Sequence, residues 1–254
     1  MEFLGRPLPF AVTISITLCM DRTHLLQASE GVTLVGGGNV TRSAVNEALT
    51  LAPRLAAADG GADRALALGR VPELVIGDLD SISPAARAAL PAGSVHRIDD
   101  QDTTDFEKCL ARIDAPLLLA VGFAGPRADH AMAVWNALVR EPLPRTIVIG
   151  AHDVIFAAPP RIDLPLRAGT RVSLFPLAPV TGESRGLHWP IGGLHFGPSG
   201  RVGTSNRATG PVTLEFDAPG MLVILPRRAL RQAAAACWQG RPGGPPVPAP
   251  ARGE

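Results

Sequence analysis

The stretch Leu74-Val75-Ile76-Gly77-Asp78-Leu79-Asp80-Ser81 is an apolar run that ends in a glycine and two carboxylates. A short apolar run before a helix-compatible segment, here 84–90, is typical of a buried strand in a parallel sheet. Such sheets bind ligands at the carboxyl ends of their strands. If the segment is extended, Asp78 and Asp80 point to one side and can bind a divalent cation. The alternative is a turn in which Asp80 or Ser81 caps the next helix.

The same order of strand, turn and helix repeats along the first 150 residues. Apolar runs predict strands at 32–35, 54–58, 74–76, 94–98, 116–121 and 146–149. Helix-compatible segments separate most of these runs, which is typical of a layered α/β fold with a mostly parallel sheet. We therefore expect an α/β domain over residues 31–150.

The first predicted turn, Gly36-Gly37-Gly38-Asn39, contains only part of a nucleotide-binding fingerprint. Gly36 and Gly38 fit two glycine positions, but Thr41 stands where the third glycine belongs. A nicotinamide cofactor is therefore disfavoured. The looser interpretation is that backbone amides of this turn and of the following helix start can receive phosphate.

Beyond residue 150 the pattern changes to short β-type runs with frequent proline and glycine. In 211–216, apolar residues alternate with polar ones, which predicts a half-buried strand. We expect a smaller antiparallel β-sandwich over 151–228, followed over 229–254 by a short helix and a disordered tail. Residues 1–30 are expected to be an N-terminal extension, in which 1–19 could derive from an upstream start codon.

The composition excludes several classes of protein. The formal net charge of +1 provides no basic excess for nucleic acid, and Lys108, the single lysine, is not part of a Walker loop. Cys19, Cys109 and Cys237 lack ligand or disulfide spacing, which favours a reducing compartment, so we expect a cytoplasmic protein. The apolar stretch 8–20 is too short to span a bilayer and fits a signal peptide poorly, so no membrane association is expected.

A second acidic segment lies at 99–105, where four aspartates occur within seven residues. Clustered carboxylates repel one another unless cations compensate them. Thr103 or Thr104 is expected to cap the following helix, which places Asp105 and Lys108 one turn apart. The structural alternative, a capped helix with a surface ion pair of at most about 0.5 kcal/mol, does not explain the acidic run.

Two further positions are candidates for ligand or phosphate contacts. Asp59 follows the strand at 54–58 and either caps the next helix or contacts a ligand. Arg127, near a helix start, can bind a phosphate through two hydrogen bonds, with Asp129 orienting it or completing the metal site.

The chain resembles the thiamine pyrophosphokinase family over most of its length, because six motifs occur in the family's order and spacing. They are 58–62, 75–82, 100–110, 125–130, 185–190 and 203–206. The resemblance implies an ATP-binding catalytic domain, a thiamine-binding β-sandwich, and a homodimer with sites between subunits. The implied reaction transfers the pyrophosphoryl group of ATP to the hydroxyl of thiamine with Mg²⁺, giving thiamine diphosphate and AMP.

The resemblance also implies roles for individual residues. Asp78, Asp80 and Asp105 would bind the metal, and with Arg127 they form the catalytic set. Residues expected to contact the nucleotide or its phosphates are Asp59, Gly60, Gln101, Asp102, Thr104, Lys108 and Asp129. Trp189 would stack on the thiamine rings, while Ser205 and Asn206 line the pocket. A flat cationic substrate suits an aromatic face, although core packing is the structural alternative for Trp189.

Departures from the family pattern leave other functions open. Pro126 precedes Arg127 where many relatives have glycine, and 207–210 follows Asn206 as a loop of unassigned role. One alternative is a pyrophosphokinase for a pterin or another hydroxymethyl heterocycle. Others are a glycosyltransferase that uses the Asp-Leu-Asp motif and a non-catalytic nucleotide or thiamine regulator. The glycosyltransferase leaves Arg127 unexplained, and a regulator has no evident use for so many carboxylates.

Overall fold

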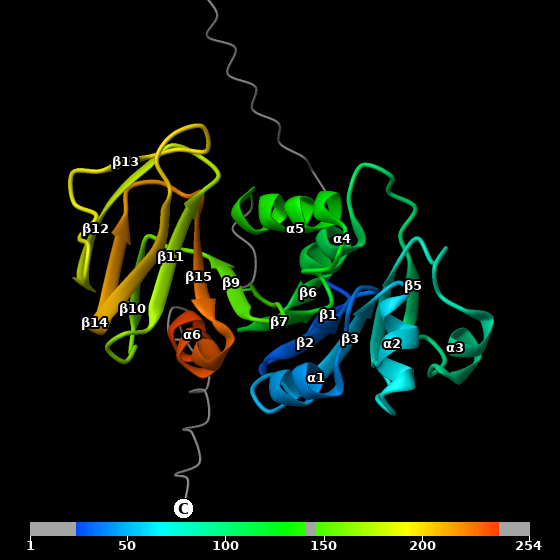
Figure 1. Ribbon diagram of the computed structural model, residues 1–254. Helices are drawn as coiled ribbons and strands as arrows, with labels where there is room; N and C mark the ends of the chain where they lie inside the picture. The colour runs from blue at the N-terminus through cyan, green and yellow to red at the C-terminus, as the bar shows by residue number, and fades with distance from the viewer. Residues whose placement is uncertain (1–23, 141–145, 239–254) are drawn as a thin grey trace, which may run out of the picture.

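The computed structural model describes residues 24–140 and 146–238 of the chain. The predicted disordered tail and the possible upstream extension at 1–19 lie outside these residues. Figure 1 shows two lobes: one has helices on both faces of a sheet, and the other consists mainly of strands. None of the helices over the described residues is long and apolar enough to cross a membrane.

The first lobe contains six parallel strands in the order β5-β4-β3-β2-β7-β8. Their bounds are β2 Val32–Val35, β3 Arg54–Ala58, β4 Leu74–Gly77, β5 Val95–Arg97, β7 Leu118–Val121 and β8 Thr146–Ile149. The chain adds strands outward from β2 to β5 and then returns to the other side of β2. The predicted parallel sheet is therefore confirmed, and its topological switch point lies between β2 and β7.

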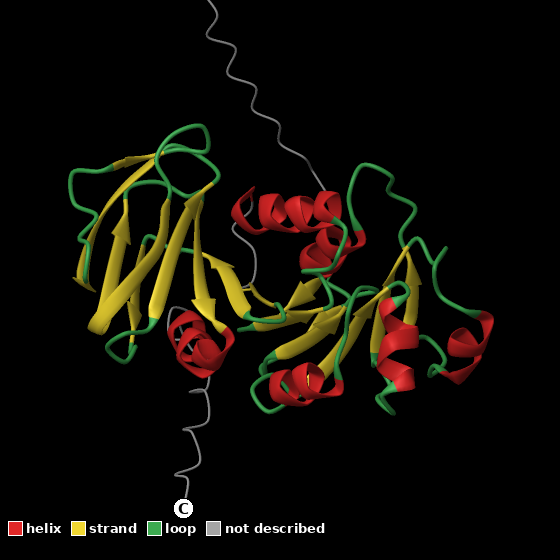
Figure 2. Ribbon diagram, viewed as in Figure 1, coloured by secondary structure: helices red, strands yellow, loops and turns green. Residues whose placement is uncertain are grey.

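Five helices cover this sheet on its two faces (Figure 2). They are α1 Arg42–Leu49, α2 Gly61–Ala67, α3 Pro84–Ala89, α4 Asp105–Arg112 and α5 Ala128–Arg140. Buried residues of α4 and α5, such as Phe106 and Leu138, share one hydrophobic cluster, while those of α1 belong to another. Because apolar helix faces pack on both sides, the strands between them are buried throughout.

Part of the expected N-terminal extension packs against this lobe. Strand β1, Leu26–Gln27, pairs in parallel with β6, Ile113–Asp114. Leu26 and Ile113 are both buried in the cluster beneath α4 and α5. Residues 24–30 thus contribute to the α/β core instead of extending from it.

The second lobe is the expected antiparallel β structure. Its strands are β9 Asp153–Ala157, β10 Arg161–Leu164, β11 Arg171–Pro176, β12 Val180–Leu187, β13 His195–Phe196, β14 Gly203–Phe216 and β15 Met221–Pro226. The first part of β14 pairs with β11, and its later part pairs with β12 and β10. This long strand therefore connects the two layers of the sandwich. The alternation expected over 211–216 is confirmed within it.

The two lobes share one continuous sheet, because β8 pairs with β9 in antiparallel fashion. The predicted boundary at residue 150 falls in the tight turn between these strands, where the Gly150 N–H donates to the Asp153 carbonyl at 2.8 Å. Helix α6, Leu230–Trp238, packs beside the junction, and its buried residues share a hydrophobic cluster with both lobes. The exact domain boundaries stay a prediction.

Gly61 provides a test of how closely α2 approaches the sheet. A Cβ atom at Gly61 would lie 2.1 Å from the Val35 carbonyl oxygen, a backbone atom that cannot move aside cheaply. We expect Gly61→Ala to lower the free energy of unfolding by about 2–3 kcal/mol despite alanine's better helix propensity. Urea denaturation measures the change. Gly210→Ala is the matched control, since a Cβ there meets nothing within 4 Å; equal stability of both variants would contradict the packing described.

Candidate active site

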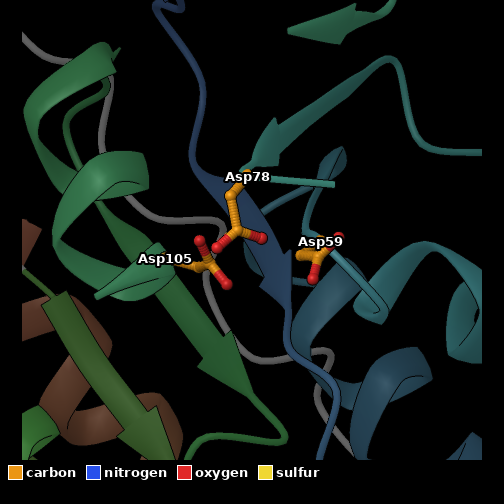
Figure 3. A group of neighbouring side chains, drawn as sticks. All are labelled: Asp59, Asp78 and Asp105. Carbon is orange, nitrogen blue, oxygen red and sulfur yellow. The ribbon is translucent and has the colours of Figure 1, made fainter. Parts of the chain in front are cut away.

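Three carboxylates meet at the carboxyl end of the parallel sheet. Asp59 follows β3, Asp78 follows β4, and Asp105 is the first residue of α4. One oxygen from each side chain lies within 4.8 Å of the others. Figure 3 shows these side chains turned toward a common space from three separate elements. The predicted convergence of residues from distant motifs is therefore observed for Asp78 and Asp105.

Backbone packing holds the three elements together. The Asp59 N–H donates to the Ile76 carbonyl at 2.9 Å, which extends the β3–β4 ladder by one residue. Gly77 permits this contact, because a Cβ there would lie 2.7 Å from the Asp59 Cβ. On the other side, Thr104 begins α4 with a capping box that includes Glu107. The Thr104 cap is thus confirmed, and it fixes the position of Asp105.

Asp59 is the most deeply buried of the three carboxylates, with 4% of the residue exposed. Its Oδ2 accepts the Ser81 N–H at 3.2 Å, but its Oδ1 is buried and has no hydrogen-bond partner among the described residues. Burial raises the pKa of Asp59, and the charge of Asp105 raises it further. Asp59 does not cap α2, since the N-cap is Gly60 without a side-chain hydrogen bond. The alternative of a capping role is therefore wrong.

Asp80 lies outside the carboxylate cluster, contrary to the expectation that it would share a side with Asp78. Leu79 has a φ of 65°, so the segment turns instead of continuing as an extended strand. The Asp80 side chain is exposed and accepts the Ser81 hydroxyl at 2.7 Å. Ser83, rather than Asp80 or Ser81, caps α3. The role of Asp80 as a metal ligand stays a prediction.

The other residues expected near phosphates lie in the segments that follow β5 and β7. Asp100 accepts hydrogen bonds from Thr103 and from the Asp102 N–H, and these bonds lower its pKa. Gln101 and Asp102 are exposed. Arg127 and Asp129 form an exposed ion pair at 2.7 Å, and the hydrogen bond from Arg127 lowers the pKa of Asp129 to about 2. Arg127 is thus oriented by Asp129, as predicted.

The glycine turn after β2 does not offer all the amides that a phosphate site would use. The Gly36 N–H donates to the Val121 carbonyl at 2.8 Å, and the Gly38 N–H donates to the Gly122 carbonyl at 3.1 Å. A Cβ at Gly38 would lie 2.5 Å from the Gly122 oxygen. These glycines therefore allow β2 and β7 to approach at the switch point, and the amides of Gly36 and Gly38 are used inside the sheet. Phosphate binding by the other amides of this turn and of the following helix start stays a prediction.

The predicted acceptor residues gather in the second lobe. Trp189, in the loop after β12, is 55% exposed, so core packing does not explain it. Buried Asn206 fixes this loop, because its Oδ1 accepts the Trp189 N–H at 3.2 Å and its Nδ2 donates to the Trp189 carbonyl at 2.7 Å. Ser205 has a φ of 63°, and its N–H donates to the Ser173 hydroxyl oxygen at 3.0 Å.

Sequence reasoning missed two features of these sites. Asp59 belongs to the carboxylate cluster, although it was expected only near the nucleotide. The position of Asp59 at the end of a strand next to β4 was the available signal. Arg207 was left without a role, yet its guanidinium lies 5.6 Å from the Trp189 ring centroid. The contact arises because the loop that carries Trp189 folds back on β14, which a sequence pattern does not reveal.

The cluster fits a hard divalent cation. Its donors are carboxylate oxygens, which Mg²⁺ prefers, and the buried Asp59 Oδ1 lacks any other partner among the described residues. Arg127 follows β7 at the carboxyl end of the same parallel sheet, and a cation with an arginine can neutralise a phosphate chain.

Comparison with known proteins places the cluster in a recognised domain. Residues 45–149 match the family model described as the thiamin pyrophosphokinase catalytic domain. This segment contains the three clustered carboxylates together with Arg127 and Asp129, and it ends before Trp189. The resemblance inferred from the motifs is confirmed for this segment.

Curated relatives agree with this match. Thiamine pyrophosphokinase 3 of Oryza sativa subsp. japonica is 30% identical over an alignment of 155 positions that covers 53% of this chain and 58% of the relative. Thiamine pyrophosphokinase 1 of Arabidopsis thaliana is 28% identical over 183 residues, covering 59% of this chain and 68% of the relative. The chain thus spans about 58% of the rice relative that it matches.

Solved structures share the fold over both lobes. Thiamin pyrophosphokinase from Candida albicans superposes with a TM-score of 0.67 at 17% identity, covering 82% of this chain and 95% of that one. Thiamine pyrophosphokinase from Bacillus subtilis superposes with a TM-score of 0.62 at 22% identity, covering 78% and 98%. The α/β lobe with its antiparallel β lobe is therefore the fold of these proteins.

The raised pKa of Asp59 predicts a pH-dependent cost to stability. A carboxyl whose folded pKa exceeds its ordinary value of 3.8 stabilises the fold while protonated, and this stability is lost as pH rises through the folded pKa. Asp59→Asn cannot ionise. Its melting temperature in EDTA, measured relative to that of the wild type, should therefore rise as the pH increases from about 3.5 to 7.

Thermal melts across this pH range measure the difference between Asp59→Asn and wild type. The control is Asp102→Asn, because Asp102 is exposed. A melting difference for Asp59→Asn that stays constant with pH would contradict the burial of an ionisable, partly unpartnered carboxyl.

Proposed function

We propose that this chain, whose residues 45–149 match the thiamin pyrophosphokinase catalytic domain, is a magnesium-dependent thiamine pyrophosphokinase. It transfers the β,γ-pyrophosphoryl group of ATP to the hydroxyl of thiamine, giving thiamine diphosphate and AMP. The observation that carries the proposal is the cluster of Asp59, Asp78 and Asp105 within the matched segment. A cytoplasmic location is part of the proposal.

The cluster would hold Mg²⁺ through Asp78, Asp105 and the unpartnered oxygen of Asp59. Asp80, one residue beyond the turn at Leu79, is proposed as a further ligand on the solvent side. When bound, the ion supplies neutralising charge to the phosphate oxygens, which is the main need of phosphoryl-type transfer. The protein's contribution is the rigid placement of its carboxylates by β3, β4 and the capped start of α4.

The phosphate chain is proposed to lie along the loops that surround the cluster. Arg127 is exposed, fully charged and oriented by Asp129, so its guanidinium can bind two phosphate oxygens. Gly60, the N-cap of α2, lies against Ser81, where a Cβ would be 3.2 Å from the Ser81 carbonyl oxygen, and its backbone is proposed to contact the nucleotide. Exposed residues on the opposite loop, Gln101, Asp102 and Thr104, complete the proposed nucleotide contacts.

The acceptor is proposed to stack on Trp189. Arg207 lies over the indole ring, so the ligand takes the remaining exposed surface or displaces this arginine. Asn206 orients the loop through the Trp189 backbone, and Ser205 lines the pocket beside it. An aromatic face attracts a flat cation such as thiamine by roughly 0.5–2 kcal/mol.

A homodimer is proposed to assemble the complete site. In Figure 1 the strands β12 and β14, which flank the Trp189 loop, lie in one lobe, while β3, β4 and α4 lie in the other. A second copy related by twofold symmetry can bring its β lobe to the carboxylate cluster of the first.

One alternative concerns the acceptor and leaves the donor chemistry unchanged. The acceptor residues Trp189, Ser205 and Asn206 all lie beyond the segment 45–149 that matches the catalytic domain. The same pyrophosphoryl chemistry could therefore serve another hydroxymethyl heterocycle, such as a pterin.

The proposal is tested with purified protein, ATP and Mg²⁺, with and without thiamine, by chromatography of nucleotides and mass identification of the product. Equal amounts of AMP and thiamine diphosphate support it. AMP released only with a pterin acceptor would support the alternative. No AMP with any acceptor, while ATP binds, would contradict pyrophosphokinase activity.

Substitution of the clustered carboxylates separates catalysis from folding. Asp78→Asn and Asp105→Asn should each lower kcat by about 100-fold or more, because oriented charge in the site is lost. The same loss is expected for Asp80→Asn if it binds the metal. Thermal melts should show all three variants folded. Near-normal turnover of Asp80→Asn with normal melting would remove Asp80 from the metal site.

Trp189→Ala should raise the KM for thiamine by roughly 3- to 30-fold and leave the KM for ATP unchanged.

The Trp189→Ala variant also tests the dimer. Because a mixed dimer with Asp78→Asn would contain one intact site, a 1:1 mixture after subunit exchange should recover about a quarter of wild-type activity at low thiamine. Activity no higher than the average of the separate variants would contradict a shared site.

A further inference from the structure

The chain buries its one lysine beside the carboxylate cluster. Lys108 is the only lysine in the sequence, and 3% of its side chain is exposed. Its Nζ donates to Asp105 Oδ1 at 3.0 Å and lies 4.0 Å from Asp78 Oδ2. The alternative of a surface ion pair, considered from the sequence, is therefore wrong.

The surroundings of Lys108 leave its charge facing the carboxylates. Phe106, Cys109 and Leu110, its neighbours on α4, are all buried. Its Nζ is held at Asp105 by a charge-assisted hydrogen bond. Among the described residues, Lys108 is therefore ion-paired with Asp105 and Asp78.

The choice of lysine also fits a role between two carboxylates. Every other basic residue of the chain, apart from histidine, is arginine. Arginine presents a planar fork that pairs with one carboxylate or phosphate, whereas lysine places a compact charge at the end of a flexible stem. A compact charge can face Asp105 and Asp78 at once, although they come from different elements.

We propose that Lys108 is the internal counter-ion of Asp78 and Asp105: it holds the two carboxylates together before metal binds, and it lowers the affinity of the cluster for divalent cations. The inference rests on the proposed function, because it takes the cluster to be the metal site. Lys108 is a positioning residue in this account. Mutual repulsion of three carboxylates is relieved by Lys108 in the free protein.

Metal binding without nucleotide tests the proposal, with Mn²⁺ as the probe and electron paramagnetic resonance of free Mn²⁺ as the readout. Lys108→Met removes the charge and keeps an unbranched stem, so the dissociation constant for Mn²⁺ should fall by about fivefold or more. Unchanged or weaker Mn²⁺ binding overturns the proposal.

Arg112→Gln is the matched control for charge on the same helix. Arg112 lies one turn beyond Lys108 and donates to its backbone carbonyl at 3.5 Å instead of contacting the cluster. We expect its Mn²⁺ dissociation constant to stay within about twofold of wild type at moderate salt. An effect as large as that of Lys108→Met would show a general charge effect and overturn the specific role.

Thermal melting in EDTA tests the counter-ion role without metal. Lys108→Met should lower the melting temperature in the wild-type background and much less in an Asp105→Asn background, because the charge to be compensated is gone. Equal losses in both backgrounds would show a packing role only and overturn the proposal. If Lys108→Met alone does not fold, recovery in the double variant supports the coupling, and failure to recover contradicts it.

These readouts separate failure of the inference from failure of the proposed function. If wild-type protein does not bind Mn²⁺, the metal site and the affinity claim fall together. The melting temperatures of Lys108→Met in the wild-type and Asp105→Asn backgrounds then still decide whether Lys108 compensates the charge of Asp105.

Discussion

The carboxylates of Asp59, Asp78 and Asp105 lie close together at the carboxyl end of the sheet, and their mutual repulsion is the constraint that the surrounding contacts must satisfy. Like-charged groups this close destabilise a fold unless something compensates them, and the compensation is built from the fold itself. Lys108 donates to Asp105, and the Ser81 N–H donates to Asp59. One buried oxygen of Asp59 stays without a partner among the described residues. A cluster kept at such cost is expected where a cation is part of the function.

Several glycines of the lobe allow close backbone approach near these strand ends. Gly77 lets Asp59 approach β4, and Gly61 lets α2 approach the carbonyl of Val35. Gly36 and Gly38 bring β2 and β7 together at the switch point, with their amides used inside the sheet. The strand ends are therefore held at fixed spacing, which gives the carboxylates a defined geometry before any ligand arrives.

Much of the fold was predictable from sequence, because buried parallel strands leave continuous apolar runs and the Thr104 cap leaves a local signature. The β8–β9 pairing that joins the lobes was not predictable, since register between lobes depends on tertiary packing. The site was predicted in part. Asp78 and Asp105 meet as expected, but the positive φ of Leu79 turns Asp80 away. Neither this turn nor the burial of Lys108 is visible in residue spacing.

The central claim is transfer of an intact pyrophosphoryl group, and ATP labelled at the β-phosphorus tests it most directly. Incubation with Mg²⁺ and thiamine, followed by separation of products, shows where the label goes. The account predicts that the label enters thiamine diphosphate in one step and that AMP is unlabelled. Label retained in ADP, with thiamine monophosphate as the product, would contradict it, because the cluster would then support γ-phosphoryl transfer.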